Sequence, residues 1–261
     1  MDTFVTKFDF AWSWMGLGIS MVFFVLLFFT DLLRNDLNKP RWQDAGWFAW
    51  VAAPMYMLHQ FEEYALYYDV KTLHHPFADM ICQKIGYGAY PDCPIPVQHY
   101  WLVNMVLWLM AMLGAWKFYK TNPMVALAPY GLILSNGLLH IGGWLSSGNS
   151  IYYYASGGTM TSIALFIPVT ILMIRACLKW KVMSGWAITA TLVAGLIGHL
   201  ILFGAYASLD AGGVVALYIF DFLAMTSPLL LTWIASKWLL KPKNSSTTTA
   251  NKNIAASGSG H

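Results

Sequence analysis

His59, Glu62 and Glu63 are the residues of this chain best suited to chemistry. They stand in the run His-Gln-Phe-Glu-Glu at 59–63, and the two glutamates are the only ones in the protein. Their spacings place all three side chains on one face of a helix. These five residues lie inside a longer segment that is apolar enough to be a membrane span. A charged side chain in the membrane costs about 2.5–3.5 kcal/mol on insertion scales. Glutamates retained at such a cost indicate a functional site.

Other apolar segments of the chain carry single polar residues that we expect to join this site. Asn136 and His140 are four residues apart and so share a helix face. Imidazoles and carboxylates are the usual donors for zinc, manganese and non-haem iron. The predicted metal ligands are His59, Glu62, Glu63, His140 and His199, a set with enough donors for one or two ions.

Further roles are predicted for residues around these ligands. Two adjacent glutamates suit a division of labour in which one binds metal and the other acts as a general base or orients a ligand. We therefore expect Glu62, Glu63 and Asp221 to be catalytic. Supporting residues are expected to be Asn104, Asn136 and Tyr218, with structural hydrogen bonding between helices as the alternative role for Asn104 and Asp221.

Composition indicates which elements position these side chains. The chain is 58% hydrophobic and only 10% charged, with 13 Trp and 14 Tyr. This is typical of a polytopic membrane protein with aromatic residues at both interfaces. No basic patch outside the apolar segments suits nucleic acid. The predicted fold is an all-α transmembrane bundle of seven helices, over residues 11–33, 45–68, 99–116, 124–145, 158–174, 183–207 and 213–236.

Charge distribution predicts the orientation of this bundle. Only Lys7, Lys71 and Lys84 of the 15 Lys and Arg residues fall on one side, which predicts an outside or lumenal N-terminus and a cytoplasmic C-terminus. On this topology the predicted site residues gather in one layer of the non-cytoplasmic half, within roughly 6 Å of each other in height. We expect a plasma or inner membrane, or the endoplasmic reticulum.

Regions outside the spans add three expectations. Residues 1–242 should form one transmembrane domain, and 243–261 a disordered tail rich in Ser, Thr and Asn. The loop 70–98 is long enough to be a functional cap. It carries Cys82 and Cys93 on the predicted oxidising side, which favours a disulfide over two separate thiols.

Two segments resemble a known family of multi-spanning membrane proteins, the HXXEE domain family. His59-Gln60-Phe61-Glu62-Glu63 followed by Tyr64 resembles its first signature. Asn136-Gly-Leu-Leu-His140 and the stretch from Tyr154 to Thr161 resemble its second. The Pro-Gly-Gly-Phe usual after the first signature is replaced here by 66–69, Leu-Tyr-Tyr-Asp. The resemblance implies which residues form a site, but it implies no reaction.

The sequence is compatible with three different functions. The first is a metal-dependent membrane enzyme, with zinc or non-haem iron, acting on a lipid-like substrate that enters from the outer leaflet. The second is a metal-free acid–base isomerase or cyclase of a sterol- or terpene-like substrate, in which a buried carboxyl donates protons and aromatic rings stabilise a cation. The third is a proton-coupled transporter or a haem protein. Membrane lipid or a small hydrophobic molecule is the expected partner, and the sequence leaves the oligomeric state open.

Overall fold

The structure is a computed structural model that describes residues 8–66, 76–148 and 157–240. Within these ranges every element is helical and no strand occurs, so the all-α prediction is confirmed. The predicted tail at 243–261 lies outside them. The elements are α1 (Phe8–Phe29), η1 (Arg41–Gln43), α2 (Ala45–Tyr64), α3 (Pro76–Lys84), α4 (Val97–Phe118), α5 (Pro123–Ala126), α6 (Pro129–Ser146), α8 (Thr159–Thr161), the π-helical turn η2 (Ser162–Phe166), α9 (Ile167–Lys179), α10 (Gly185–Ala207) and α11 (Leu209–Leu239).

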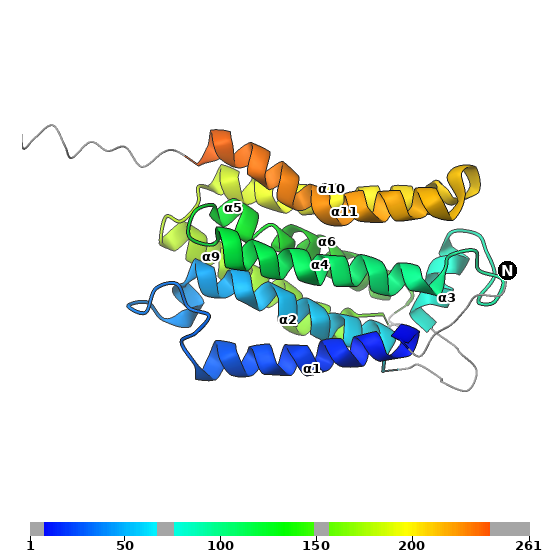
Figure 1. The fold of residues 1–261 in the computed structure, drawn as a ribbon, viewed down its shortest axis with the longest axis horizontal. Helices are drawn as coiled ribbons and strands as arrows, with labels where there is room; N and C mark the ends of the chain where they lie inside the picture. Colours follow the sequence, from blue (N-terminus) through cyan, green and yellow to red (C-terminus); the bar gives the residue numbers. More distant parts are fainter. Residues whose placement is uncertain (1–7, 67–75, 149–156, 241–261) are drawn as a thin grey trace, which may run out of the picture.

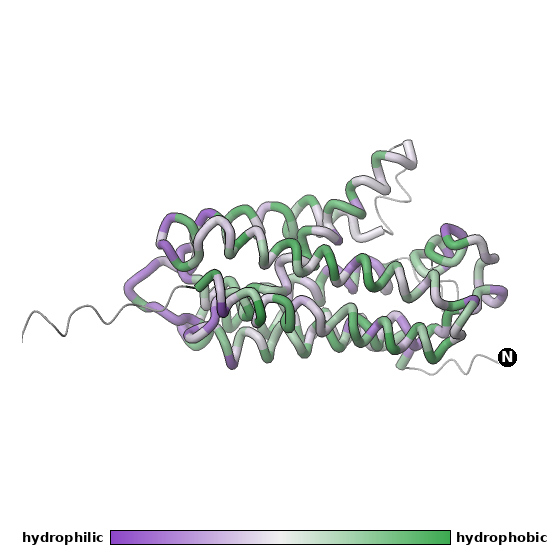
Figure 2. The backbone as a smooth tube through the Cα atoms, turned by 90° about the horizontal axis from the view of Figure 1, so that it is seen from above, coloured by the Kyte–Doolittle hydropathy of each residue, from purple (hydrophilic) through white to green (hydrophobic). Residues whose placement is uncertain are grey.

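Within the described ranges, six helical segments are long and apolar enough to cross a membrane, which indicates a multi-pass integral membrane protein. They coincide with six of the predicted spans. Figure 2 shows hydrophobic residues along the helices and hydrophilic residues concentrated in the loops at the two ends of the bundle. The six segments are Phe8–Phe29, Val97–Phe118, Pro123–Ser146, Thr159–Lys179, Gly185–Ala207 and Leu209–Leu239.

The remaining predicted span, 45–68, corresponds to α2, which is too polar near its C-terminal end to be counted with the six. It is the internal helix of the bundle: 16 of its 20 residues are buried, against 6 of the 22 in α1. A helix covered by protein on all sides can carry polar side chains that lipid would not tolerate. Its start is fixed by Asp44, whose carboxylate accepts a hydrogen bond from the backbone N–H of Gly46.

The long helices lie side by side along one axis, with α1 on the outside of α2 (Figure 1). From α2, successive contacts run to α4, then α11, then α10, then α6, and return to α2 through α6, η2 and α9. This circuit encloses an interior onto which α2, α4, α6, α10 and α11 all project side chains. Residues remote in sequence can therefore meet there.

A close crossing of α6 and α10 fixes part of this circuit. A Cβ on Gly195 would lie 2.0 Å from the backbone carbon of Gly131. Small residues allow such backbone approaches between membrane helices. A second close approach lies at Gly198 of α10, where a Cβ would meet the carbonyl oxygen of Ala224 at 2.8 Å.

Gly195→Ala is expected to destabilise the protein by about 1–3 kcal/mol, because two backbones must separate to admit the methyl group. Thermal unfolding in detergent measures the effect. Gly142→Ala is the matched control, since the described part of the chain places nothing within 4 Å of its Cβ. It should stabilise helix α6 by about 0.5–1 kcal/mol. Equal unfolding temperatures for the two variants would refute the close crossing.

An ordered cap covers the end of the bundle where α2 stops. The predicted disulfide between Cys82 and Cys93 is confirmed and ties α3 to the chain preceding α4. Burial raises the pKa of Tyr90, so its hydroxyl stays protonated and donates to the carbonyl of Ile95 at 2.6 Å. Phe77 of α3 packs its ring against Tyr64 at the end of α2. The described part of loop 70–98 is thus a folded lid over the helix that carries the glutamates.

Candidate metal centre

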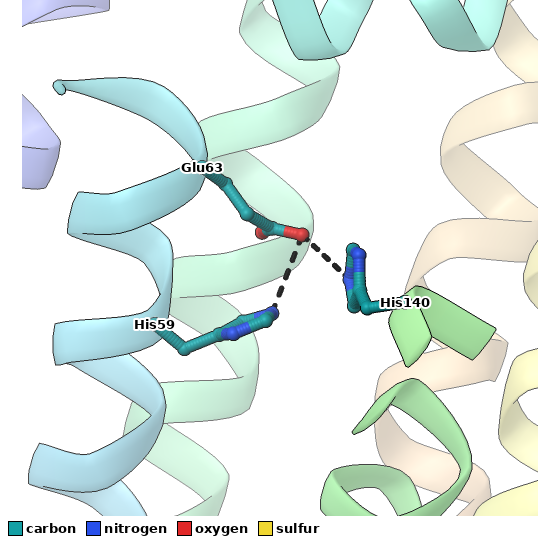
Figure 3. A group of neighbouring side chains, drawn as sticks. All are labelled: His59, Glu63 and His140. Carbon is teal, nitrogen blue, oxygen red and sulfur yellow. Dashed lines mark ion pairs between the residues drawn. The ribbon is translucent and has the colours of Figure 1, made fainter. Parts of the chain in front are cut away.

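His59 and Glu63 of α2 meet His140 of α6 in a buried group (Figure 3). Glu63 Oε1 lies 2.8 Å from His140 Nε2 and 3.3 Å from His59 Nε2. One ligand atom from each residue lies within 4.8 Å of the other two. The three side chains are 0–6% exposed, so the group is shielded from bulk solvent.

These separations are close to those around a single transition-metal ion. Two bonds of about 2.05 Å place their ligand atoms about 3.3 Å apart at a tetrahedral angle and about 2.9 Å apart at a right angle. Two imidazoles and one carboxylate leave further coordination positions open on zinc or on iron. The group could therefore hold one ion and still accept a water or a substrate atom.

Glu62 points away from this group toward the start of α8. Its Oε1 accepts from the backbone N–H of Met160 at 2.8 Å, and its Oε2 from the N–H of Thr161 at 2.7 Å. The hydroxyl of Thr161 donates to the same Oε2 at 2.5 Å. Backbone N–H groups at a helix start favour a carboxylate. With both oxygens engaged, Glu62 lies outside the ligand group that sequence reasoning assigned it to.

The Thr161 hydroxyl also fixes the state of His59. It lies 2.7 Å from His59 Nδ1. Because its one hydrogen is directed at the Glu62 carboxylate, the oxygen must accept from His59 Nδ1–H. In the neutral imidazole the lone pair of His59 is then on Nε2, directed toward Glu63. In metal sites the second N–H of a ligating imidazole is usually donated to an oxygen that fixes the ring. Here the Thr161 hydroxyl, itself bound to Glu62, is that oxygen.

Thr161→Val should weaken metal binding about 10- to 100-fold, because it removes the hydroxyl that orients His59 while keeping the side-chain shape. Equilibrium dialysis against buffered zinc measures the change. Thr161→Ser, which retains a hydroxyl, is the control and should bind nearly as tightly as the natural protein. Equal affinities in the two variants would refute the orienting role.

The chain between α6 and η2 approaches the group closely. Gly158 adopts a left-handed conformation with φ +71°, and a Cβ there would lie 2.4 Å from His59 Cε1. The Phe166 ring at the end of η2 packs against the His59 ring with centroids 4.4 Å apart. A π-helical turn is uncommon and frequently occurs at functional sites. Tyr154, part of the second signature, lies outside the described residues.

A cavity of about 270 Å³ adjoins the group and is lined by Glu63, His140 and His199 together with apolar side chains. The predicted ligand His199 lies on this cavity but outside the three-residue group, with its Nδ1 2.7 Å from the Ser135 hydroxyl. Asn136 also lines the cavity, and its Oδ1 finds no hydrogen-bond partner among the described residues.

Asn104 and Asp221 occupy the other wall of the interior. Asn104 lines the cavity and donates to the carbonyl of Tyr100 at 2.8 Å. Asp221 accepts from His99, at 2.7 Å, and does not join the three-residue group. Tyr218 is half-buried one turn before Asp221, outside the cavity lining formed by the described residues.

His99 is the residue that sequence reasoning missed. It appeared only as the first residue of the predicted span 99–116, although α4 begins two residues earlier, at Val97. It is fully buried. Its position at the same end of the bundle as His59 and His140 was the one signal available, because its partner Asp221 is 122 residues away in the chain.

Comparison with known proteins agrees with the resemblance of the two signatures. Residues 50–174 match the model of a family described as "Protein of unknown function with HXXEE motif". The matched region contains His59, Glu62, Glu63, His140, Gly158 and Thr161. No curated protein and no solved structure matches the chain.

Proposed function

The chain belongs to the HXXEE family through residues 50–174, and we propose that it is an integral-membrane metal-dependent enzyme acting on a lipid-like substrate. His59, Glu63 and His140 would bind one zinc or non-haem iron ion. Bound there, the ion would act as a Lewis acid or activate an oxygen ligand. Glu62 and Thr161 hold His59 in the required orientation.

The observation that carries this proposal is the pair of acceptors facing each other in the group. His59 Nε2 presents a lone pair, and the described part of the chain offers it no hydrogen-bond donor. It faces Glu63 Oε1 at 3.3 Å. When His59 is neutral, these two atoms are acceptors that repel each other in a buried site unless a proton or a metal cation lies between them. A metal ion satisfies them and the His140 nitrogen together.

The cavity beside the group supports a hydrophobic substrate. Besides its polar residues, the cavity is lined by apolar side chains such as Leu132, Leu139 and Leu202. Its volume of about 270 Å³ is slightly below the range of about 300–1,000 Å³ typical of ligand pockets. This suits a small lipid-like molecule or one end of a longer one.

Metal analysis of protein purified without chelators tests the proposal. We expect about one equivalent of zinc or iron per chain, removable by a chelator and restored by adding the ion, and its identity selects between the two metals. Less than about a tenth of an equivalent, with no uptake on addition, would overturn the proposal. Lipid extracts of cells producing the natural protein or Glu63→Gln then identify the molecule that accumulates.

Metal-free acid–base chemistry is the second candidate, because Glu63 Oε1 is also within hydrogen-bonding distance of His140 Nε2. The rings of Tyr56, Tyr64 and Phe77 line the adjoining cavity and could stabilise a developing cation. This candidate requires turnover to persist in protein stripped of metal. The haem alternative is weak because the Glu63 carboxylate stands between the two imidazoles (Figure 3).

The proposal includes seven spans, with α2 as the internal one, an outside or lumenal N-terminus and a cytoplasmic C-terminus. The bias of Lys and Arg supports it. The cap disulfide of Cys82 and Cys93 is compatible with the oxidising side. Epitope tags at the two chain ends, probed with protease in sealed vesicles, should be cleaved from opposite faces. Cleavage of both tags from one face would exclude an odd number of spans.

A further inference from the structure

A second polar cluster lies in the interior, formed by His99 of α4, Tyr206 of α10 and Asp221 of α11. His99 Nδ1 is 2.7 Å from Asp221 Oδ2, and His99 Nε2 is 3.2 Å from the Tyr206 hydroxyl. His99 and Asp221 are 0% and 2% exposed. None of the three belongs to the group of His59, Glu63 and His140.

The donors and acceptors of this cluster determine which hydrogen-bonding position remains available to a ligand. An ionised Asp221 accepts the Nδ1 proton of His99, so the imidazole is held in one orientation. With neutral His99, Tyr206 donates to Nε2 and its oxygen can accept from a ligand. With protonated His99, Tyr206 accepts from Nε2–H and can donate its own hydrogen. In either state the Tyr206 hydroxyl keeps hydrogen-bonding capacity for a ligand.

That capacity is directed at the same cavity as the candidate metal centre, because both His99 and Tyr206 line it. The apolar lining of the cavity includes Val103 of α4 and Phe203 of α10. Gln60, 1% exposed, also lines the cavity, and its Oε1 lacks a hydrogen-bond partner among the residues described. Buried acceptors without partners indicate that a polar group or water fills the site.

We propose that Tyr206, positioned by His99 and Asp221, binds the oxygen of a hydrophobic alcohol or ketone in this cavity. The inference rests on the proposed function in taking this molecule as the substrate of the metal centre, and it names the substrate class. His99 and Asp221 are positioning residues, and Tyr206 is the contact. A carboxylate–imidazole–phenol chain of this kind adapts to an oxygen that either donates or accepts.

Photoaffinity labelling with two matched probes tests this assignment. One probe is a medium-chain fatty alcohol with a diazirine in its chain, and the other is the corresponding alkane without the hydroxyl group. The full-length protein in detergent is irradiated with each, and labelled peptides are identified by mass spectrometry. We expect the alcohol to label α4 and α10 around Val103 and Phe203 about fivefold more than the alkane, the effect of one hydrogen bond of ordinary net strength.

The preference for the alcohol should disappear in Tyr206→Phe and fall in Asp221→Asn, and labelling by the alkane should be unchanged. Tyr119→Phe is the matched control, since Tyr119 lies past the C-terminal end of α4 and outside the cavity lining. It should keep the full preference. Circular dichroism verifies that each variant is folded, and Asp221→Asn provides the test if Tyr206→Phe fails to fold.

Repeating the labelling on chelator-treated protein separates this inference from the proposed function. A preference that depends on Tyr206 and survives metal removal supports the site, even if metal analysis has already failed. A preference that is insensitive to Tyr206→Phe but lost with the metal would overturn it, because the oxygen then binds the ion. Absence of any preference in the natural protein would overturn it as well.

Discussion

Glu63→Gln is expected to lower bound metal from about one equivalent to below about a tenth. Glu63 is the one carboxylate of the group and lies between both imidazoles, at 2.8 Å and 3.3 Å. The substitution keeps the side-chain volume but replaces an anionic donor by a neutral amide, a much poorer ligand for zinc or iron. Elemental analysis after gel filtration in detergent measures the loss.

Asp9→Asn is the control for removing a buried carboxylate from the same bundle. Asp9 in α1 is 5% exposed and accepts from the indole N–H of Trp101 at 2.7 Å. It should retain the natural metal content, even if it unfolds at a lower temperature. Full metal content in Glu63→Gln would show that the ligands are other residues. Metal loss in both variants would mean that Glu63→Gln acts through the fold.

Glu62→Gln should give an intermediate result. Both of its carboxylate oxygens are bound by Met160 and Thr161, and it contacts His59 only through the Thr161 hydroxyl. Removing an orienting group of this kind weakens metal binding about 10- to 100-fold without abolishing it. Affinity, measured against buffered zinc, separates this variant from Glu63→Gln. Equal losses in the two glutamate variants would contradict the division of roles.

The difference between the two glutamates shows where sequence reasoning reached its limit. Spacings of three and four residues both place a side chain on the face of His59. Helical periodicity therefore predicted that Glu62 and Glu63 could serve the site but could not assign their roles. The choice depends on Thr161, which lies 102 residues from His59 in the chain. Thr161 is brought there by the packing of α8, η2 and α9 against α2.

The other site residues were predicted from polar side chains within apolar segments. The cost of burying His140, His199 and Asp221 among apolar residues predicted that they serve a common interior, and the first two line the same cavity. Asp221 lies behind that lining, bound to His99. His99 was overlooked because it stands at a predicted helix start, where a polar residue has an ordinary explanation. Its burial by the cap and the neighbouring helices is a tertiary effect.

The α2 helix illustrates the same limit for the fold. Hydropathy identifies segments that face lipid, such as α1, because exposed apolar side chains are what lipid requires. An internal helix is free of that requirement, so the polar end of α2 makes it look less like a span than any of its neighbours. This helix nevertheless carries His59 and Glu63, two of the three residues of the candidate metal group.

Gly158→Ala is the second substitution with a large expected effect on metal binding. Its effect has two causes, the strained backbone conformation and the overlap of the new methyl group with the candidate ligands. Gly148→Ala separates them. Both glycines have φ +71°, where alanine costs about 1–2 kcal/mol. Around Gly148 the described chain leaves 4 Å of open space for a Cβ, whereas at Gly158 it would lie 2.4 Å from His59 Cε1 and 3.0 Å from Glu63 Cγ. Gly148→Ala should therefore lose only the stability that alanine costs at this backbone conformation, and its metal content should be unchanged.

In Gly158→Ala the added methyl group must displace the His59 ring, the Glu63 side chain or the start of α8. Each displacement separates ligand atoms that a single ion requires within a few ångströms of each other, so metal binding should fall at least as far as in Thr161→Val. Dialysis against buffered zinc and thermal unfolding, measured on both glycine variants, resolve the two effects. Equal metal affinity in the two would mean that the left-handed glycine serves the backbone alone. A loss confined to Gly158→Ala would mean that the absence of a side chain at this glycine leaves the space that the His59 imidazole occupies.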